Sequence, residues 1–282
     1  MHRRATSVVG AVLVALTVAT PSAAQVRYST GAVGKYMASC GGSDLPLAVP
    51  ESNRVQFWYD GAGFARVTTW EDGNVWGSDF RDGFRANDTD PSGGSDLPDV
   101  YVFAGHGNCQ NPPQPGSGDY VIVCGNFGKP DVTRIGTSSR WGNSPGRLKF
   151  MLLDASCPMD LPEVPTEWFS PFRGLHVATG NSGSVDHDVY DSVDRGGEFA
   201  AYSTGAQFQA LGIQLSLLPT LSVGDAWMTT GLIDVQDGNC AVALAAGENR
   251  DDAINRRDNE FLTSNWPDPT PNWFAWRWIC ID

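Results

Sequence analysis

The sequence predicts one α/β domain built on a mostly parallel β-sheet with helices on both faces. Three observations lead to this fold class. After an N-terminal leader, about 258 residues remain, which suits a single large domain. Hydrophobic residues make up 41% of the chain, enough for a full core. Several short runs are apolar on consecutive residues, as in strands that are covered on both faces.

The predicted strands are short apolar runs bounded by turn-forming residues. The run Val100-Tyr-Val-Phe-Ala104 is the clearest of them. The full set of predicted strands covers residues 55–59, 100–104, 120–123, 148–153, 175–179 and 240–246, with a terminal aromatic strand at 273–281. Residues 105–147 are rich in Gly, Pro, Asn and Ser, and we expect mostly loop there.

Helical patterns are weaker and lie in the second half of the chain. Ser222 and Asp225 have the spacing of a capping box ahead of an apolar stripe that ends at Ile233. Residues 198–209 and the charged segment 248–261 are the other expected helices. His176 lies inside an apolar run, which favours a hydrogen-bonded core histidine.

The N-terminus has the pattern of a cleavable secretory signal at residues 1–24. Arg3 and Arg4 form a positive start, an apolar stretch too short to span a bilayer follows, and Ala24 ends a small-residue cleavage site. We therefore expect a secreted or periplasmic protein. The remaining chain divides into an N-terminal extension at 25–50 and an α/β domain at 51–282.

The strong acidity limits the partners that the protein can have. The formal net charge is −13, and removal of the leader would make it more negative. A chain this acidic repels phosphate backbones and anionic lipids, which excludes nucleic acid and the membrane surface as main partners. No later segment is long and apolar enough for membrane insertion.

Two predicted strands end in residues that can carry chemistry. His106 follows the strand at 100–104 and stands between two glycines, and Cys157 follows the strand at 148–153. If the two strands are parallel neighbours, both side chains open onto the carboxyl edge of the sheet. An imidazole beside a thiol can generate the nucleophilic thiolate. The backbone N–H groups of Gly107 and Cys157 are the candidate oxyanion donors.

At these residues the chain resembles the caspase-like cysteine peptidase clan, which includes gingipains, legumains and metacaspases. The resemblance rests on Gly105-His106-Gly107 and on Asp154-Ala-Ser-Cys157, in an exported bacterial branch of that clan. It implies a three-layer caspase-like fold, His106 as general acid and base, Cys157 as nucleophile, and a peptide or protein substrate. Asp154 departs from the usual acidic position by one residue, so no preference for cleavage after Arg or Lys is predicted.

Six cysteines follow the leader, an even number that permits three disulfides in fifteen arrangements. We expect Cys109 to pair with Cys124 and Cys240 with Cys280. The hydrolase hypothesis needs Cys157 as a free thiol. The alternative is a catalytically silent, disulfide-stabilised binding domain on the same fold, which a disulfide at Cys157 would favour.

Two further groups of acidic residues are candidate binding residues. Asp154 and Asp186 follow strands and could line a substrate pocket. Asp88, Asp90, Ser92 and Asp99 partly match the spacing of a calcium-binding EF-hand loop, although Pro91 interrupts it. The hydrolase hypothesis needs no cofactor, and calcium at this loop stays open as a second possibility.

Overall fold

The computed structural model of the 282-residue chain describes most of the sequence after residue 24. The described residues are 25–36, 43–80, 94–107, 109, 120–124, 130–135, 139–142, 146–161, 168–185, 194–210, 213–233 and 239–280. The predicted signal segment at 1–24 lies outside them.

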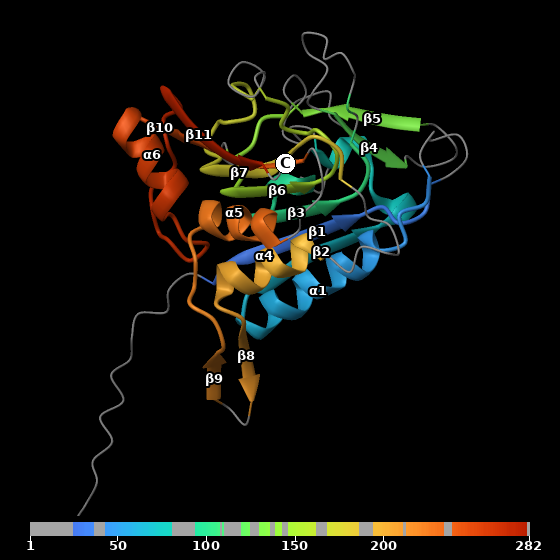
Figure 1. The fold of residues 1–282 in the computed structure, drawn as a ribbon, viewed down its shortest axis with the longest axis horizontal. Helices are drawn as coiled ribbons and strands as arrows, with labels where there is room; N and C mark the ends of the chain where they lie inside the picture. Colours follow the sequence, from blue (N-terminus) through green and yellow to red (C-terminus); the bar gives the residue numbers. More distant parts are fainter. Residues whose placement is uncertain are drawn as a thin grey trace, which may run out of the picture.

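A seven-stranded sheet forms the centre of the molecule, in the order β2-β1-β3-β6-β7-β10-β11 (Figure 1). The pairs from β2 to β7 are parallel, whereas β10 is antiparallel to both β7 and β11. The predicted mostly parallel α/β sheet is therefore confirmed. Its strands are β1 (Arg27–Ala32), β2 (Ala65–Glu71), β3 (Val100–Ala104), β6 (Phe150–Asp154), β7 (Val177–Ser182), β10 (Cys240–Gly247) and β11 (Trp273–Cys280).

Alternate residues of the central strands lie in two separate hydrophobic cores, one on each face of the sheet. Tyr101 and Phe103 of β3 lie in one core, and Val100 and Val102 lie in the other. All five residues of β3 and all five of β6 are buried. Successive side chains of a strand point to opposite faces, so a strand covered on both sides must be apolar throughout.

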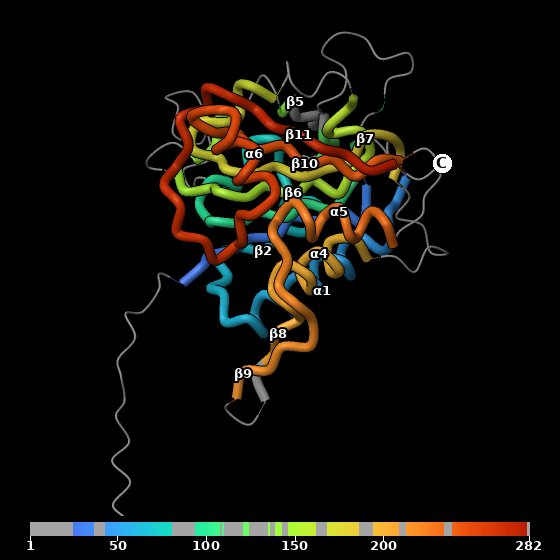
Figure 2. Tube along the Cα trace, turned by 60° about the vertical axis from the view of Figure 1, so that its left-hand side comes forward, coloured from blue at the N-terminus to red at the C-terminus, as the bar shows by residue number. Residues whose placement is uncertain are grey.

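The α-helices of the described chain lie on one face of the sheet and at its β10–β11 end (Figure 2). The helices are α1 (Ala48–Gly61), α4 (Arg195–Thr204), α5 (Val223–Ile233) and α6 (Arg250–Asn259). Three of them place Val55, Phe199 and Trp227 in the core on that face. Ser222 accepts a hydrogen bond from the Asp225 N–H at 3.1 Å, as the predicted cap requires.

The opposite face is covered mainly by an antiparallel pair and short 3₁₀ helices instead of α-helices. The pair is β4 (Tyr120–Cys124) with β5 (Pro130–Arg134), and the 3₁₀ helices are η3 (Gly77–Phe80) and η4 (Gly94–Asp96). Buried Val121, Trp141 and Phe172 complete that core. The expected α-helices are thus found on one face only among the described residues.

Residues 27–32 contradict the predicted N-terminal extension. They form β1, which lies between β2 and β3 inside the sheet. The strand was not predicted because it contains polar residues, which usually indicate exposure to solvent. Ser29 and Thr30 are fully buried, and they are hydrogen-bonded to Thr68 and Ser52 respectively. The domain therefore begins before residue 51.

The predicted strand at 55–59 is wrong, because these residues belong to α1. Val55 and Tyr59 are buried while Phe57 between them is 60% exposed. Burial four residues apart is the spacing of one helix face. In the sequence, the mostly apolar run at 55–59 does not reveal this four-residue helical spacing.

The remaining described elements are small. They are the hairpin β8 (Gln207–Ala210) with β9 (Ile213–Ser216), which protrudes below α1 in Figure 1, and the 3₁₀ helix η2 (Asp72–Asn74). Within the described part of the chain, no helix has the length and apolar character needed to cross a bilayer.

Candidate active site

His106 and Cys157 follow β3 and β6, which are adjacent parallel strands paired from Val100 with Phe150 to Ala104 with Asp154. The two strand ends are in direct contact beyond this pairing. A Cβ atom built on Gly107 would lie 1.8 Å from the carbonyl oxygen of Ser156. Only glycine permits this close approach. The predicted common edge is therefore confirmed, and Ser156 fills the position that a side chain at residue 107 would take.

Cys157 is bonded to Cys109, three residues beyond His106, in a disulfide. The predicted pairing of Cys109 with Cys124 is therefore wrong. The contact between the two strand ends brings Cys109 next to Cys157. In this state the sulfur of Cys157 is neither a thiol nor a nucleophile. The predicted Cys240–Cys280 disulfide is confirmed. Cys40 and the side chain of Cys124 lie outside the described atoms.

The backbone of Cys157 also differs from the predicted oxyanion arrangement. Its N–H donates to the carbonyl of Gly183 at 2.9 Å, so this donor is already engaged. Its φ angle is +56°, in the left-handed region that residues other than glycine seldom occupy. Such strain is concentrated at functional sites, although it does not identify the function.

The His106 ring is held by contacts on two sides. Its Nε2 lies 2.8 Å from the carbonyl oxygen of Ser43. A carbonyl only accepts, so Nε2 carries the proton and Nδ1 is the basic nitrogen of the neutral ring. The Tyr36 ring packs beside the imidazole at 4.6 Å between centroids, and its hydroxyl accepts from the His106 N–H at 2.7 Å. Burial raises the pKa of Tyr36 far above its ordinary value, so this hydroxyl stays neutral.

Asp154 is buried and does not line an open pocket. One carboxylate oxygen accepts from the Asn181 side chain at 2.9 Å, and Asn181 in turn accepts from Arg195 at 2.9 Å. The second oxygen has no hydrogen-bond partner among the described residues. The expected role of Asp154 in a substrate pocket is therefore wrong, since it supports the end of β7 instead. Asp186 lies outside the described residues.

An acidic group that the sequence did not single out lies near this network. Asp194 caps α4 by accepting from the Gly197 N–H at 2.9 Å, and it pairs with Arg54 at 2.6 Å. Burial raises the pKa of Asp194 to about 6, although these two contacts oppose the shift. The signal for the cap was available, because Asp is a preferred N-cap residue and Asp194 directly precedes the helix.

Three of the four candidate calcium ligands, Asp88, Asp90 and Ser92, lie outside the described residues. The fourth, Asp99, is occupied by other contacts. Its carboxylate accepts from the Arg27 N–H at 2.8 Å and pairs with Arg147 at 3.1 Å. No cluster of three or more potential metal-binding side chains occurs among the described residues.

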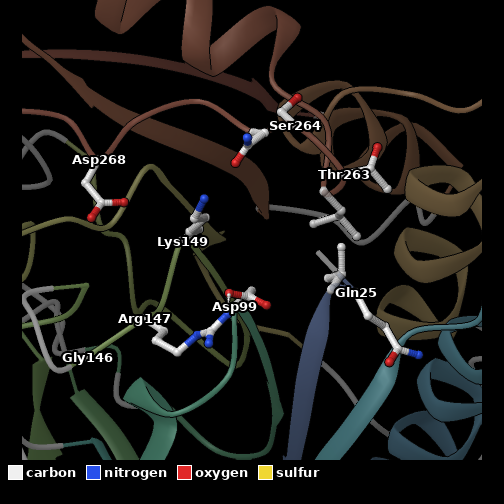
Figure 3. A pocket seen from close by; sticks show the side chains of 11 residues that line it. Gln25, Asp99, Gly146, Arg147, Lys149, Thr263, Ser264 and Asp268 are labelled. Carbon is white, nitrogen blue, oxygen red and sulfur yellow. Dashed lines mark hydrogen bonds and ion pairs between the residues drawn. The ribbon is translucent and has the colours of Figure 1, made fainter. Parts of the chain in front are cut away.

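A separate polar pocket of about 310 Å³ opens at the opposite, amino-terminal edge of the sheet (Figure 3). Lys149, which directly precedes β6, and Asp268, in the loop between α6 and β11, line this pocket, as does the Arg147–Asp99 ion pair. Asp268 also forms a hydrogen bond with Nε2 of the fully buried His176 at 3.2 Å. The other ring nitrogen, Nδ1, is hydrogen-bonded to the Glu260 carboxylate at 2.5 Å. The prediction that His176 is a satisfied core histidine is confirmed.

Comparison with known proteins identifies the family. A family model described as "Domain of unknown function (DUF6345)" matches residues 33–279. The comparison with curated proteins gives no match. The matched segment begins directly after β1 and includes His106, Cys157 and nearly all of β11. It covers far more than half of the sequence, and the chain therefore belongs to the DUF6345 family.

Proposed function

We propose that this protein is an exported cysteine-dependent hydrolase of the caspase-like type that acts on peptide bonds, and that it is inactive while Cys157 is bonded to Cys109. The observation that carries the proposal is the contact between the two strand ends. Gly107 touches Ser156, and these are the direct neighbours of His106 and Cys157. Two segments about fifty residues apart in sequence thus deliver an imidazole and a sulfur to one rim, as the resemblance implies.

Reduction of the Cys109–Cys157 disulfide is the first step of the proposed mechanism. A dithiol reductant supplies two electrons and two protons, becomes a disulfide itself, and leaves Cys109 and Cys157 as thiols. Nδ1 of His106 then takes the proton from the Cys157 thiol. The resulting thiolate is the attacking species.

Peptide hydrolysis then follows in two stages. The Cys157 thiolate attacks the carbonyl carbon, and the tetrahedral intermediate collapses as protonated His106 gives its proton to the departing amine. Water, deprotonated by His106, releases the acyl group and restores the thiol. Gly107 supplies the remaining candidate oxyanion N–H, because the N–H of Cys157 is bonded to Gly183.

The Cys109→Ser variant tests the proposal without any reductant. Loss of Cys109 leaves Cys157 as a free thiol while the Cys240–Cys280 bond stays intact. We expect this variant to cleave members of a peptide library that the oxidised wild type leaves uncut. Adding His106→Ala or Cys157→Ala should lower the cleavage rate at least about 100-fold, because each removes one half of the dyad.

A matched control separates activation from general loosening of the fold. The Cys240→Ser/Cys280→Ser variant also loses one disulfide but keeps Cys157 bonded, so it should stay inactive. Cleavage by both disulfide variants, or cleavage that survives Cys157→Ala, would remove Cys157 from the mechanism.

A second candidate function is a catalytically silent binding domain. Two observations favour it: Cys157 is in a disulfide, and its N–H is engaged. In that case the Cys157 thiol of the Cys109→Ser variant should be no more reactive than an ordinary thiol. Alkylation rates across pH, with and without His106→Ala, measure this directly. A rate that is insensitive to His106, together with no cleavage, supports the silent domain.

Export is part of the proposal. The two disulfides fit a protein that resides in an oxidising compartment. Cleavage of the signal after Ala24 would make Gln25 the first residue, two positions before β1 begins. N-terminal sequencing of the protein recovered from the periplasm or medium tests this expectation.

A further inference from the structure

The outer edge of β11 pairs with no other strand in the described part of the chain, and it carries an aromatic surface. Among the described residues, β11 ends the seven-stranded sheet and pairs with β10 on one side only. Three tryptophans of this strand are exposed: Trp273 at 52%, Trp276 at 37% and Trp278 at 53%. In Figure 1, β11 lies at the upper left of the molecule, near β10 and α6. An exposed apolar edge strand is a template for pairing with another chain.

The backbone groups that point to the outer edge can be identified from the ladder. Cys240 and Cys280 lie opposite each other with a Cα–Cα distance of 4.1 Å, which is the short spacing of a non-hydrogen-bonded pair. The pairs alternate along the ladder, so Val242 with Trp278 and Leu244 with Trp276 are also non-hydrogen-bonded. The N–H and C=O groups of Trp276 and Trp278 therefore face away from β10.

Two independent contacts agree with this assignment. The N–H of Ala246 donates to the carbonyl of His176 on the β7 side, so the β11 residue opposite it, Phe274, faces outward. The carbonyl of Trp276 accepts from Arg257 of α6 at 2.9 Å, which requires that this carbonyl points out from the sheet. Outward groups thus occur at Phe274, Trp276 and Trp278.

The same three residues carry the aromatic surface. Residues two apart in a strand share a face, so their rings form one row beside the outward backbone groups. Phe274 packs on the fully buried Phe172 at 5.4 Å between ring centroids, which anchors the row to the core. A hollow of about 670 Å³ lies over the row, and Arg250 of α6 also lines it.

The two edge strands of the sheet differ in the polarity of their side chains, and this difference indicates that β11 is the edge that binds a partner. β2, at the other edge, reads Ala-Arg-Val-Thr-Thr-Trp-Glu and carries charged and hydroxyl side chains. β11 reads Trp-Phe-Ala-Trp-Arg-Trp-Ile-Cys and is pinned to β10 at its end by the Cys240–Cys280 disulfide. The β2 edge thus has more of the polar protection usual for an unpaired strand, whereas the β11 edge has Arg257 on the Trp276 carbonyl and is otherwise mainly aromatic.

We propose that the β11 edge binds an extended peptide segment of another protein by strand addition. The occupant has apolar side chains at alternate positions, which pack on the rings of Trp276 and Trp278, and an acidic residue that pairs with Arg250. Among the described contacts, Arg250 forms no ion pair, whereas Arg257 is bound by Asp258 at 2.7 Å. Main-chain hydrogen bonds supply affinity in this mode, and the alternate side chains supply specificity.

A peptide fits this edge better than a second copy of the chain. Two-fold pairing of β11 strands about Trp276 would place the Arg257 guanidinium of each copy at the same centre, since Arg257 reaches the Trp276 carbonyl. Each copy also carries a net charge of −13, which opposes self-association. A single strand without a flanking helix avoids both penalties.

The test uses an acetylated, amidated peptide of alternating valine and threonine with glutamate at both ends. Binding to the oxidised wild-type protein is measured by calorimetry. A second peptide with the same side chains is N-methylated at alternate residues, which removes its backbone donors. We expect the first peptide to bind and the methylated peptide to bind at least about 100-fold more weakly.

Two substitutions at one position separate the ring from the backbone. Trp276→Ala removes the ring and keeps the outward N–H, whereas Trp276→Pro removes both without breaking the ladder to β10. We expect Trp276→Pro to bind about tenfold more weakly than Trp276→Ala, the value of one net hydrogen bond. Trp76→Ala, at an equally exposed tryptophan outside β11, should leave binding unchanged.

The proposal is overturned if the methylated peptide binds as well as its parent, if neither peptide binds, or if Trp76→Ala weakens binding as much as Trp276→Ala. Sedimentation of the wild type gives the remaining outcome. A dimer that Trp276→Pro dissociates would show that a second copy occupies the edge, which contradicts a peptide partner. None of these results depends on catalysis at Cys157.

Discussion

Removal of the Cys240–Cys280 disulfide provides a quantitative test of how the bond stabilises this fold. The bond joins residues 40 apart in sequence, and the Cys109–Cys157 bond joins residues 48 apart. In the chain-entropy model, closing a loop of either size stabilises the protein by about 4 kcal/mol, because it restricts the unfolded chain. The two loops do not overlap in sequence, so the two effects should add.

The Cys240→Ser/Cys280→Ser variant isolates the unfolded-state effect. The β10–β11 ladder pairs eight residues of each strand, so the folded strand stays in register without the bond. We expect the free energy of unfolding to fall by about 4 kcal/mol at 25 °C, with a larger denaturant slope because the unfolded chain expands. Urea titration followed by tryptophan fluorescence measures both quantities. A loss below about 1 kcal/mol would refute the entropic account for this bond.

Two further predictions concern buried charges. Burial raises the pKa of Asp194 to about 6, so between about pH 4 and 6 the folded state keeps a proton that the unfolded chain has released. The stabilising contribution of the protonated form is therefore lost as pH rises through 6. Asp194→Asn should flatten this pH dependence, by up to about 3 kcal/mol between pH 4 and 7 in urea titrations; an unchanged profile would contradict the shift. Glu260→Ala should cost about 3–5 kcal/mol because it leaves His176 in a fully buried site without its carboxylate. Asp268→Ala, on the other nitrogen of the same ring but 60% exposed, should cost less than about 1 kcal/mol; equal losses would show that burial does not decide the value of the pair.

The parts of the fold that were predictable from sequence are those whose burial is complete and local. Residues 100–104 and 150–154 are apolar on consecutive positions because both of their faces are covered. The helix that begins at Val223 was predictable because Ser222 provides its cap within three residues. In each case the signal lies within a few neighbouring residues.

β1 and α1 were mispredicted because distant partners decide their environment. Ser29 and Thr30 are buried only because Thr68 and Ser52 satisfy their hydroxyl groups. Such partners lie more than twenty residues away, and nothing in the local pattern identifies them. The run at 55–59 is apolar in sequence, yet only packing of α1 against the sheet decides which of its residues are buried.

The sequence by itself determined the mostly parallel α/β sheet, the strands that precede His106 and Cys157, and the acidic character. It could not determine which sulfur Cys157 meets, because six cysteines permit fifteen arrangements of equal local plausibility. The tertiary structure decides this point: β3 and β6 are neighbours, so the segment after His106 lies against Ser156 and brings Cys109 to Cys157. It also decides that β11 is an edge strand, since strand order depends on pairings between segments far apart in the chain. Short-range patterns specify elements, whereas contacts across long sequence separations specify the site.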